Sequence, residues 1–126
     1  MGRVRVLACT GLSIPLLGSA ANHVLQLIEP PAGDEFLGAE MWRLMREGGL
    51  FAWVVLGHVV TGILLLTPRW RFVGALLQLP ITLGIAAFNL TMFPPGITPA
   101  LIMLALNLIA LADPVALRAL VASSRR

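Results

Sequence analysis

The sequence predicts an all-α protein: an integral membrane four-helix bundle with a short amphipathic outer-face helix between spans 1 and 2. Of the 126 residues, 58% are hydrophobic and 12% are charged, against roughly 25% charged in a soluble domain. Four apolar stretches are separated by short polar or proline-containing segments, at about residues 6–28, 50–67, 72–93 and 97–112. We therefore expect a single membrane domain over residues 1–126, with no room for a soluble catalytic domain.

The first apolar stretch follows two arginines, Arg3 and Arg5. A basic start, an apolar centre and the small residues of segment 18–21 also fit a secretory signal peptide, which is the alternative. The apolar run continues past residue 21, which favours a retained span. Small and polar residues recur here at steps of three and four, which places them on one helix face. They are Gly11, Pro15, Gly18, Ser19, Asn22 and Gln26, with His23 beside them.

The segment between the first two spans is the one sizeable polar stretch of the chain. Pro30-Pro31 indicates a loop, and Asp34 is placed to cap a helix over about residues 35–47. Apolar and charged residues alternate along that helix at amphipathic spacing, and Trp42 suits a membrane interface. We expect this helix to lie on the membrane or to cover the outer end of the bundle.

The second and third spans form a hairpin around a basic turn. Residues 50–67 carry no formally charged side chain and make a helix roughly 27 Å long, enough for a bilayer core of about 30 Å. His58 is an ionisable side chain at its mid-depth, where polar groups are expensive and usually face inward. The third span, 72–93, carries Gln78 and Asn89 on one face.

The fourth span covers about residues 97–112 and carries Asn107 on its polar face. Asp113 precedes a proline, which fits a helix cap followed by the first residue of a new helix. We therefore expect a short C-terminal helix over about 114–122 near the membrane surface.

Arginines give the orientation, because short cytoplasmic loops collect basic residues. With four spans, seven of the nine arginines fall on the side of the two termini. This predicts that both termini are cytoplasmic. The exclusive use of arginine is typical of a GC-rich bacterial genome, and we expect the protein in a bacterial inner membrane. The other side holds Arg43 and Arg46 among five acidic residues. No basic patch with interleaved aromatics lies outside the membrane, so the sequence gives no sign of nucleic-acid binding.

The polar faces of the four spans are expected to meet inside the bundle. By depth, His58 and Asn107 lie near the midplane, and the remaining candidates lie in the outer third. One interpretation is interhelical hydrogen bonding, at about 0.6 kcal/mol for each bond. The other is a pocket for a quinone ring, a lipid or another amphiphile. The candidate cofactor-binding residues are His58, Asn107, Asn89, Asn22, His23 and Gln26.

A further alternative role for His58 is axial ligation, because imidazole is a common axial ligand of haem and chlorophyll-type pigments. The simpler interpretation is a neutral imidazole bonded to a neighbouring polar group. Cys9 is the only cysteine, so no multi-cysteine metal site is possible, and we predict no other metal ligand. The sequence has no Gly-rich phosphate loop, HExxH or CxxC, and predicts no catalytic residue, so a non-enzymatic role is favoured.

Several short features follow one another between Gly11 and Leu117 in a characteristic order and spacing. They are Asn22-His23 ending a small-residue helix, Pro30-Pro31 with Phe36, Thr61-Gly62-Ile63-Leu64-Leu65-Leu66 before a basic turn, Pro80, and Phe88-Asn89 before a proline turn. In these features the chain resembles the DoxX-like family of small four-helix bacterial membrane proteins. Many members of that family are similar to one another in having Glu where His58 stands and His where Asn89 stands.

The resemblance implies an association with membrane redox systems, including thiosulfate–quinone chemistry and oxidative-stress complexes, and supplies no catalytic residues. We expect an accessory, non-catalytic subunit of a membrane redox or energy-converting complex, embedded in the lipid bilayer beside larger membrane subunits. A DoxX-like quinone-linked oxidoreductase subunit and a pigment- or haem-binding protein using His58 are the alternatives.

Overall fold

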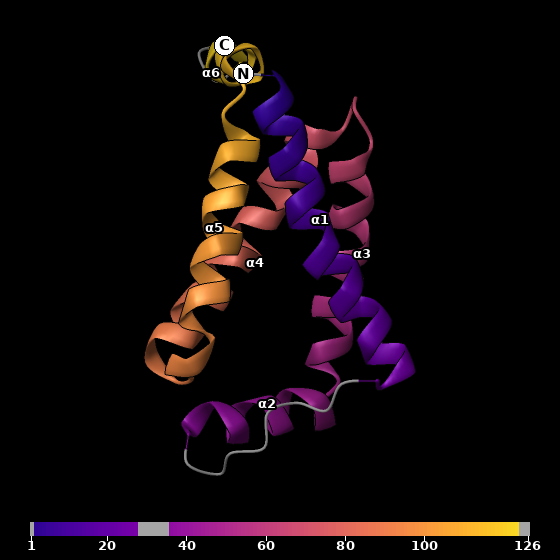
Figure 1. Cartoon of the computed structure of the whole chain (residues 1–126), viewed down its shortest axis with the longest axis vertical. Coiled ribbons are helices and arrows are strands. Elements are labelled where there is room, and N and C mark those ends of the chain that lie inside the picture. The colour runs from indigo at the N-terminus through magenta and orange to yellow at the C-terminus, as the bar shows by residue number, and fades with distance from the viewer. Residues whose placement is uncertain (1, 28–35, 124–126) are drawn as a thin grey trace.

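The computed structural model describes residues 2–27 and 36–123, and over these residues the secondary structure is helical (Figure 1). The predicted loop prolines Pro30 and Pro31 and the predicted cap Asp34 lie outside the described residues. The helices lie within a few residues of the ranges expected from the sequence. They are α1 (Gly2–Leu25), α2 (Leu37–Glu47), α3 (Leu50–Leu66), α4 (Arg71–Thr91), the 3-10 turn η1 (Pro94–Gly96), α5 (Ile97–Leu111) and α6 (Pro114–Ser123).

In the described part of the chain, the helices α1, α3, α4 and α5 pack against one another, and the shorter α2 and α6 cross the ends of this bundle. α1 packs against α3 and α5, and α4 packs against the same two helices, so each of the four has two neighbours. α2 lies across one end, and α6 lies across the other, beside the start of α1 (Figure 1). We refer to these as the α2 end and the α6 end.

Several helices are long and apolar enough to cross a membrane. By length and hydropathy, α1, α4 and the segment Pro94–Leu111 qualify individually. α3 is shorter and qualifies only together with α2, from which it is bent by 87°. Large apolar side chains face outward on three different helices, with Leu7 70%, Trp53 72% and Leu90 70% exposed. Such a surface is typical of a helical bundle surrounded by lipid.

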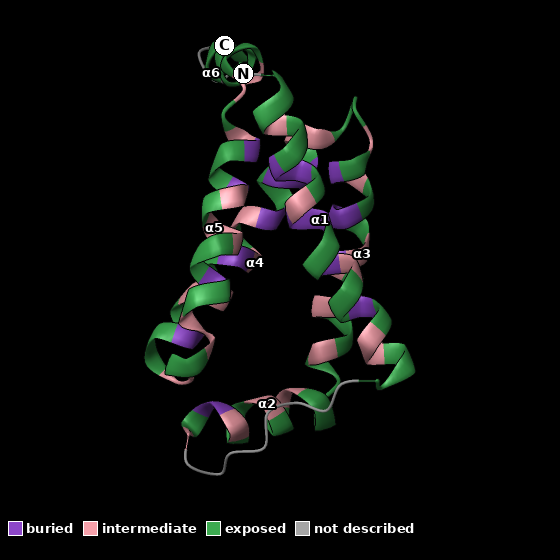
Figure 2. Cartoon of the chain, viewed as in Figure 1, coloured by how far each residue is buried: buried purple, intermediate pink, exposed green. Residues whose placement is uncertain are grey.

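The core lies where the four helices are closest, toward the α6 end, and the helices diverge toward the α2 end (Figure 2). Gly74 permits the close approach of α4 to α3, because a Cβ there would lie 2.8 Å from the Cβ of Leu64. Small side chains favour such contacts between membrane helices. The fully buried cluster consists of Cys9, Leu12, Leu16, Leu65, Ala75 and Ala110.

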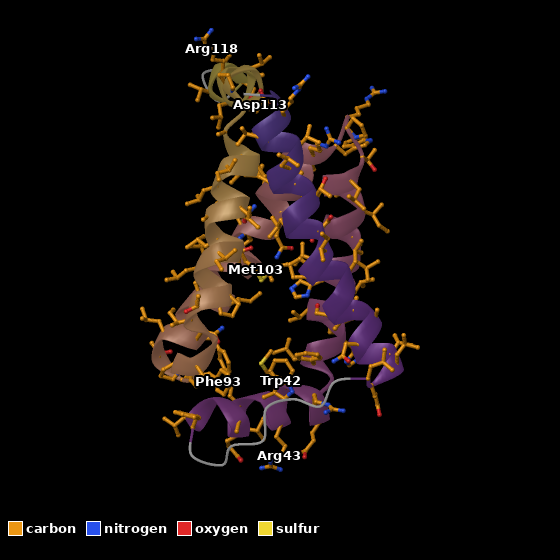
Figure 3. All side chains as sticks on the ribbon, in the orientation of Figure 1. Trp42, Arg43, Phe93, Met103, Asp113 and Arg118 are labelled. Carbon is orange, nitrogen blue, oxygen red and sulfur yellow. The ribbon has the colours of Figure 1, made fainter. Side chains whose placement is uncertain are left out.

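α2 bridges the diverging helices as the amphipathic pattern predicts. At its start, the Gly38 amide donates to the Met92 carbonyl at 3.0 Å, and a Cβ at Gly38 would lie 2.8 Å from that oxygen. At its far end, Gly49 turns the chain into α3 with a φ of 75°. Trp42 faces the bundle, whereas Arg43 points away from it (Figure 3). α2 thus covers the α2 end with its apolar face inward.

α6 begins with the predicted aspartate cap. Asp113 Oδ1 accepts hydrogen bonds from the amides of Val115 at 3.0 Å and Ala116 at 3.2 Å. Its Oδ2 lies 2.6 Å from Arg5 Nη1, which ties α6 to the start of α1. The prediction that Asp113 is a helix cap is therefore confirmed.

The first helix ends earlier than predicted. We expected it to reach residue 28, but it stops at Leu25, and Gln26 has a φ of 51°. The Gln26 amide still donates to the Asn22 carbonyl at 2.8 Å, which closes the last turn. A left-handed residue after the last turn is a common way to end a helix, although glycine is the usual residue there.

Candidate functional site

A chain of polar contacts joins α3 to α4 inside the bundle. Thr61 Oγ1 donates to Gln78 Oε1 at 2.6 Å, and Gln78 Nε2 donates to Thr82 Oγ1 at 3.3 Å. All three side chains are buried. Both polar ends of the Gln78 amide are therefore bonded within the protein. The Thr61–Gln78 contact behaves as an interhelical hydrogen bond.

Asn107 links α5 to α4. Its Nδ2 donates to the Ala75 carbonyl at 2.9 Å, and the side chain is fully buried. The Asn107 Oδ1 atom is also buried and has no hydrogen-bond partner. A buried amide oxygen without a donor is unusual, because satisfied polar groups are the rule in protein interiors.

His58 faces α1 and is only 8% exposed. Its Nδ1 lies 3.0 Å from Ser19 Oγ, and its Nε2 is buried without a partner. Ser19 Oγ also lies 3.0 Å from the Leu16 carbonyl, to which it can donate. The imidazole is thus held from one side only, with a free nitrogen on the other.

The Ser19 hydroxyl fits either neutral tautomer of His58, because it can accept from Nδ1 or donate to it. When Ser19 donates to Leu16, the Nδ1–H of His58 donates to Ser19, and Nε2 is an acceptor. When Ser19 donates to Nδ1, Nε2 carries the ring proton and is a donor. The two arrangements differ in the position of the ring proton as well as in the hydroxyl rotation, and the imidazole is neutral in both.

His58 and Asn107 do not lie at the common depth that we expected. The Thr61–Gln78 bond places those two residues at one level. His58 lies one turn from Thr61 toward the α2 end, and Ala75 lies one turn from Gln78 toward the α6 end. At about 1.5 Å per residue, the two steps amount to roughly 9 Å along the bundle. Because Asn107 bonds Ala75, the two candidates lie at different depths in the bundle.

At the α2 end, His23 belongs to an aromatic stack. Its ring centroid lies 5.3 Å from that of Phe51, and Phe51 lies 4.4 Å from Trp42. The stack joins α1, α3 and α2. Trp42 Nε1 is buried there without a hydrogen-bond partner. His23 is therefore a packing residue in this structure, roughly 10 Å along α1 from Leu16 of the core.

The other three candidate residues, Asn89, Asn22 and Gln26, differ in how deeply they are buried. Asn89 is buried, but its Nδ2 donates to Ile85 of the same helix at 2.7 Å, and its Oδ1 lies against Gly96. Asn89 thus stabilises the turn into α5. Asn22 is half-buried near the end of α1, and Gln26 is exposed beyond that end. Gln26 is not part of the buried polar interior, because the helix stops before it.

Sequence reasoning left Ser19 and Trp42 out of the candidate set. Ser19 lies on the same polar face as Asn22, and this spacing could have marked it as a partner for a polar group on a neighbouring helix. Trp42 was expected at the membrane interface, and nothing in its spacing indicates a buried indole nitrogen. Among the described residues, no group of three or more His, Cys, Asp or Glu side chains is placed to hold a metal ion.

Comparisons of the chain with protein-family models, with curated proteins and with solved structures find no match.

Proposed function

We propose that the chain is a four-span protein of the bacterial inner membrane that binds the head group of a quinone-class amphiphile in its interior. In this proposal it is an accessory, non-catalytic subunit of a redox or energy-converting complex. The resemblance to the DoxX-like family supports the redox setting. The outward-facing apolar side chains support contact with lipid and with larger membrane subunits.

The observation that carries the proposal is the buried, unpartnered Nε2 of His58. A buried polar atom without a partner costs about 1–3 kcal/mol, and a ligand that bonds it recovers that cost. Ser19 fixes the ring from the opposite side at 3.0 Å, so the nitrogen is already oriented. Pre-orientation of this kind lowers the entropy cost of binding.

The chemistry of that nitrogen suits a quinol and quinone pair. As an acceptor, Nε2 can bond a quinol hydroxyl, and as a donor, it can bond a quinone carbonyl. The Ser19 hydroxyl can bond Nδ1 in both states, as acceptor in the first and as donor in the second. The bundle diverges on this side of the core toward α2, where Trp42 adds an indole N–H without a partner.

Binding can be measured with a short-chain ubiquinol and ubiquinone and the full chain in lipid nanodiscs. We expect His58→Ala to weaken the binding of both forms about tenfold or more, since one hydrogen bond and its orientation are lost. His23→Ala is the matched control, because that histidine packs on Phe51 instead. We expect it to change the affinity less than twofold. Equal effects of the two variants, or no binding by the unaltered chain, would contradict the site.

The accessory role has a separate test. Purified in mild detergent from its native membrane, the protein should migrate together with other membrane subunits. A stable monomer without any partner would count against this part of the proposal and would leave the His58 site untouched.

A second candidate function follows from the same nitrogen. In the state where Ser19 donates to Leu16, Nε2 carries a lone pair and is able to ligate a haem iron or the magnesium of a chlorophyll-type pigment. The absorption spectrum of the protein, purified with its lipids, distinguishes this function. A Soret or pigment band that disappears in His58→Ala supports it, and a colourless preparation rules it out.

A further inference from the structure

A small recess opens between α1 and the α3–α4 turn at the α6 end of the bundle. It has a volume of about 60 Å³ and is lined by Gly2, Arg5, Val6, Pro68 and Arg71. Two guanidinium groups from separate helices thus border one recess at the edge of the apolar bundle. This recess is separate from the proposed quinone site at His58.

Each arginine is held in position by its Nε. Arg5 Nε donates to the Ala110 carbonyl at 3.1 Å, in the last turn of α5. Arg71 Nε donates to the Leu65 carbonyl at 3.2 Å, in the last turn of α3. Arg5 also pairs with Asp113 through Nη1 at 2.6 Å, so its Nη2 and both terminal nitrogens of Arg71 stay available. Cations also interact favourably with helix C-termini, which stabilises both side chains there.

Among the described residues, acidic groups at this end neutralise only one of the two arginines. Among the described residues, the only carboxylate near the α6 end is Asp113, and it bonds Arg5 Nη1 at 2.6 Å. Arg71 therefore has no acidic partner in the described part of the chain. Arg3, Arg69 and Arg118 add further positive charge at the same end.

We propose that the recess between Arg5 and Arg71 binds the phosphate group of an anionic ligand. Guanidinium groups bind phosphate oxygens in a planar, bidentate geometry, and basic recesses at the ends of membrane helices recognise anionic lipid head groups. Val6 and Pro68 give the recess apolar walls beside the hydrocarbon region. Its volume of about 60 Å³ is of the order of a single phosphate group. The phosphate can belong to a lipid or to a free anion.

The affinity for phosphatidylglycerol, measured by native mass spectrometry on the full chain in detergent, tests the site. We expect Arg71→Gln to weaken binding about tenfold or more, because charge-assisted hydrogen bonds are lost. Arg69→Gln removes the same charge from the same turn without touching the recess. We expect it to change the affinity less than twofold. Circular dichroism verifies that both variants remain helical.

A second variant tests whether binding needs the open recess as well as the two charges. Val6→Trp fills the recess and keeps both arginines, so we expect a loss of binding similar to that of Arg71→Gln. Millimolar inorganic phosphate identifies the source of the ligand. Competition with phosphatidylglycerol assigns the site to free phosphate, and lack of competition assigns it to the lipid head group. Equal losses in Arg69→Gln and Arg71→Gln, or full binding by Val6→Trp, would overturn the proposal.

Discussion

Thr61 makes the shortest hydrogen bond between side chains of two different bundle helices. Its hydroxyl lies 2.6 Å from Gln78 Oε1, and both residues are buried. Interhelical hydrogen bonds in membrane proteins contribute about 0.6 kcal/mol on average. Removing one partner adds the cost of an unsatisfied buried acceptor.

Thr61→Val should lower the free energy of unfolding by about 1–2 kcal/mol, because Gln78 Oε1 loses its donor while the shape is kept. Thr67→Val is the control, since the Thr67 hydroxyl bonds Ile63 of its own helix at 2.9 Å and is exposed to the surroundings. The free energy of unfolding of both variants is measured in mixed micelles with increasing amounts of a denaturing detergent. Equal destabilisation would mean that the bond to Gln78 contributes nothing.

Glycine is required where the turn after α4 meets Asn89. A Cβ at Gly96 would collide with Asn89 Oδ1, whereas a Cβ at Gly84 would meet nothing within 4 Å. Gly96→Ala should therefore destabilise the protein by about 1–3 kcal/mol through overpacking. Gly84→Ala should stabilise it by about 0.5–1 kcal/mol, because alanine is the better helix former. The midpoint of thermal unfolding in detergent is measured for both variants. A Gly96→Ala midpoint equal to that of the unaltered protein would contradict the predicted collision with Asn89.

At the scale of the element, the two short helices close the ends of the bundle by different contacts. α2 is held by the backbone hydrogen bond from Gly38 to Met92 at one end and by the aromatic pair of Trp42 and Phe51 at the other. α6 is held by the charge and the hydrogen bonds of Asp113. Only the attachment of α6 should therefore depend on pH through a carboxylate.

The amide of Ala116 lowers the pKa of Asp113, and the Arg5 guanidinium lowers it further. A carboxyl group with a lowered pKa stabilises the folded state fully above its usual value near 4. That contribution is lost as the pH falls through the lower folded pKa. The docking of α6 should thus be constant from about pH 8 to pH 5 and weaken below about pH 4.

A spin label at Ala119 reports this change as increased mobility in the electron paramagnetic resonance spectrum. Asp113→Asn should raise the mobility at neutral pH and remove the acid transition. A transition near pH 6 would indicate a different titrating group.

For the whole molecule, the arginines and the apolar surface together define how the bundle sits in a bilayer. The start of α1, the α3–α4 turn and α6 lie together at one end, and these segments hold Arg3, Arg5, Arg69, Arg71 and Arg118 (Figure 1). α2 lies at the other end, with Arg43 paired to Glu40 and Glu47 on its outward face. Under the rule for cytoplasmic arginines, we expect the α6 end to face the cytoplasm.

Cysteine labelling tests this orientation and the number of spans. Single cysteines at Glu47, Arg69 and Ser123, in a Cys9→Ala background, are exposed to a membrane-impermeant maleimide in spheroplasts. Four spans predict labelling at position 47 only. If α3 does not cross the membrane, positions 47 and 69 lie on one side and are labelled together, which would contradict the four-span proposal.

The sequence by itself predicted the helices, the amphipathic α2 and the Asp113 cap, because these depend on hydropathy and on contacts a few residues apart. It also identified which residues make up the polar faces. Only the tertiary structure decided which of them meet. It paired His58 with Ser19, separated Asn107 from His58 by two turns, and placed His23 in an aromatic stack. The tilt and axial shift of packed helices set these contacts, and no local pattern in the chain encodes either quantity.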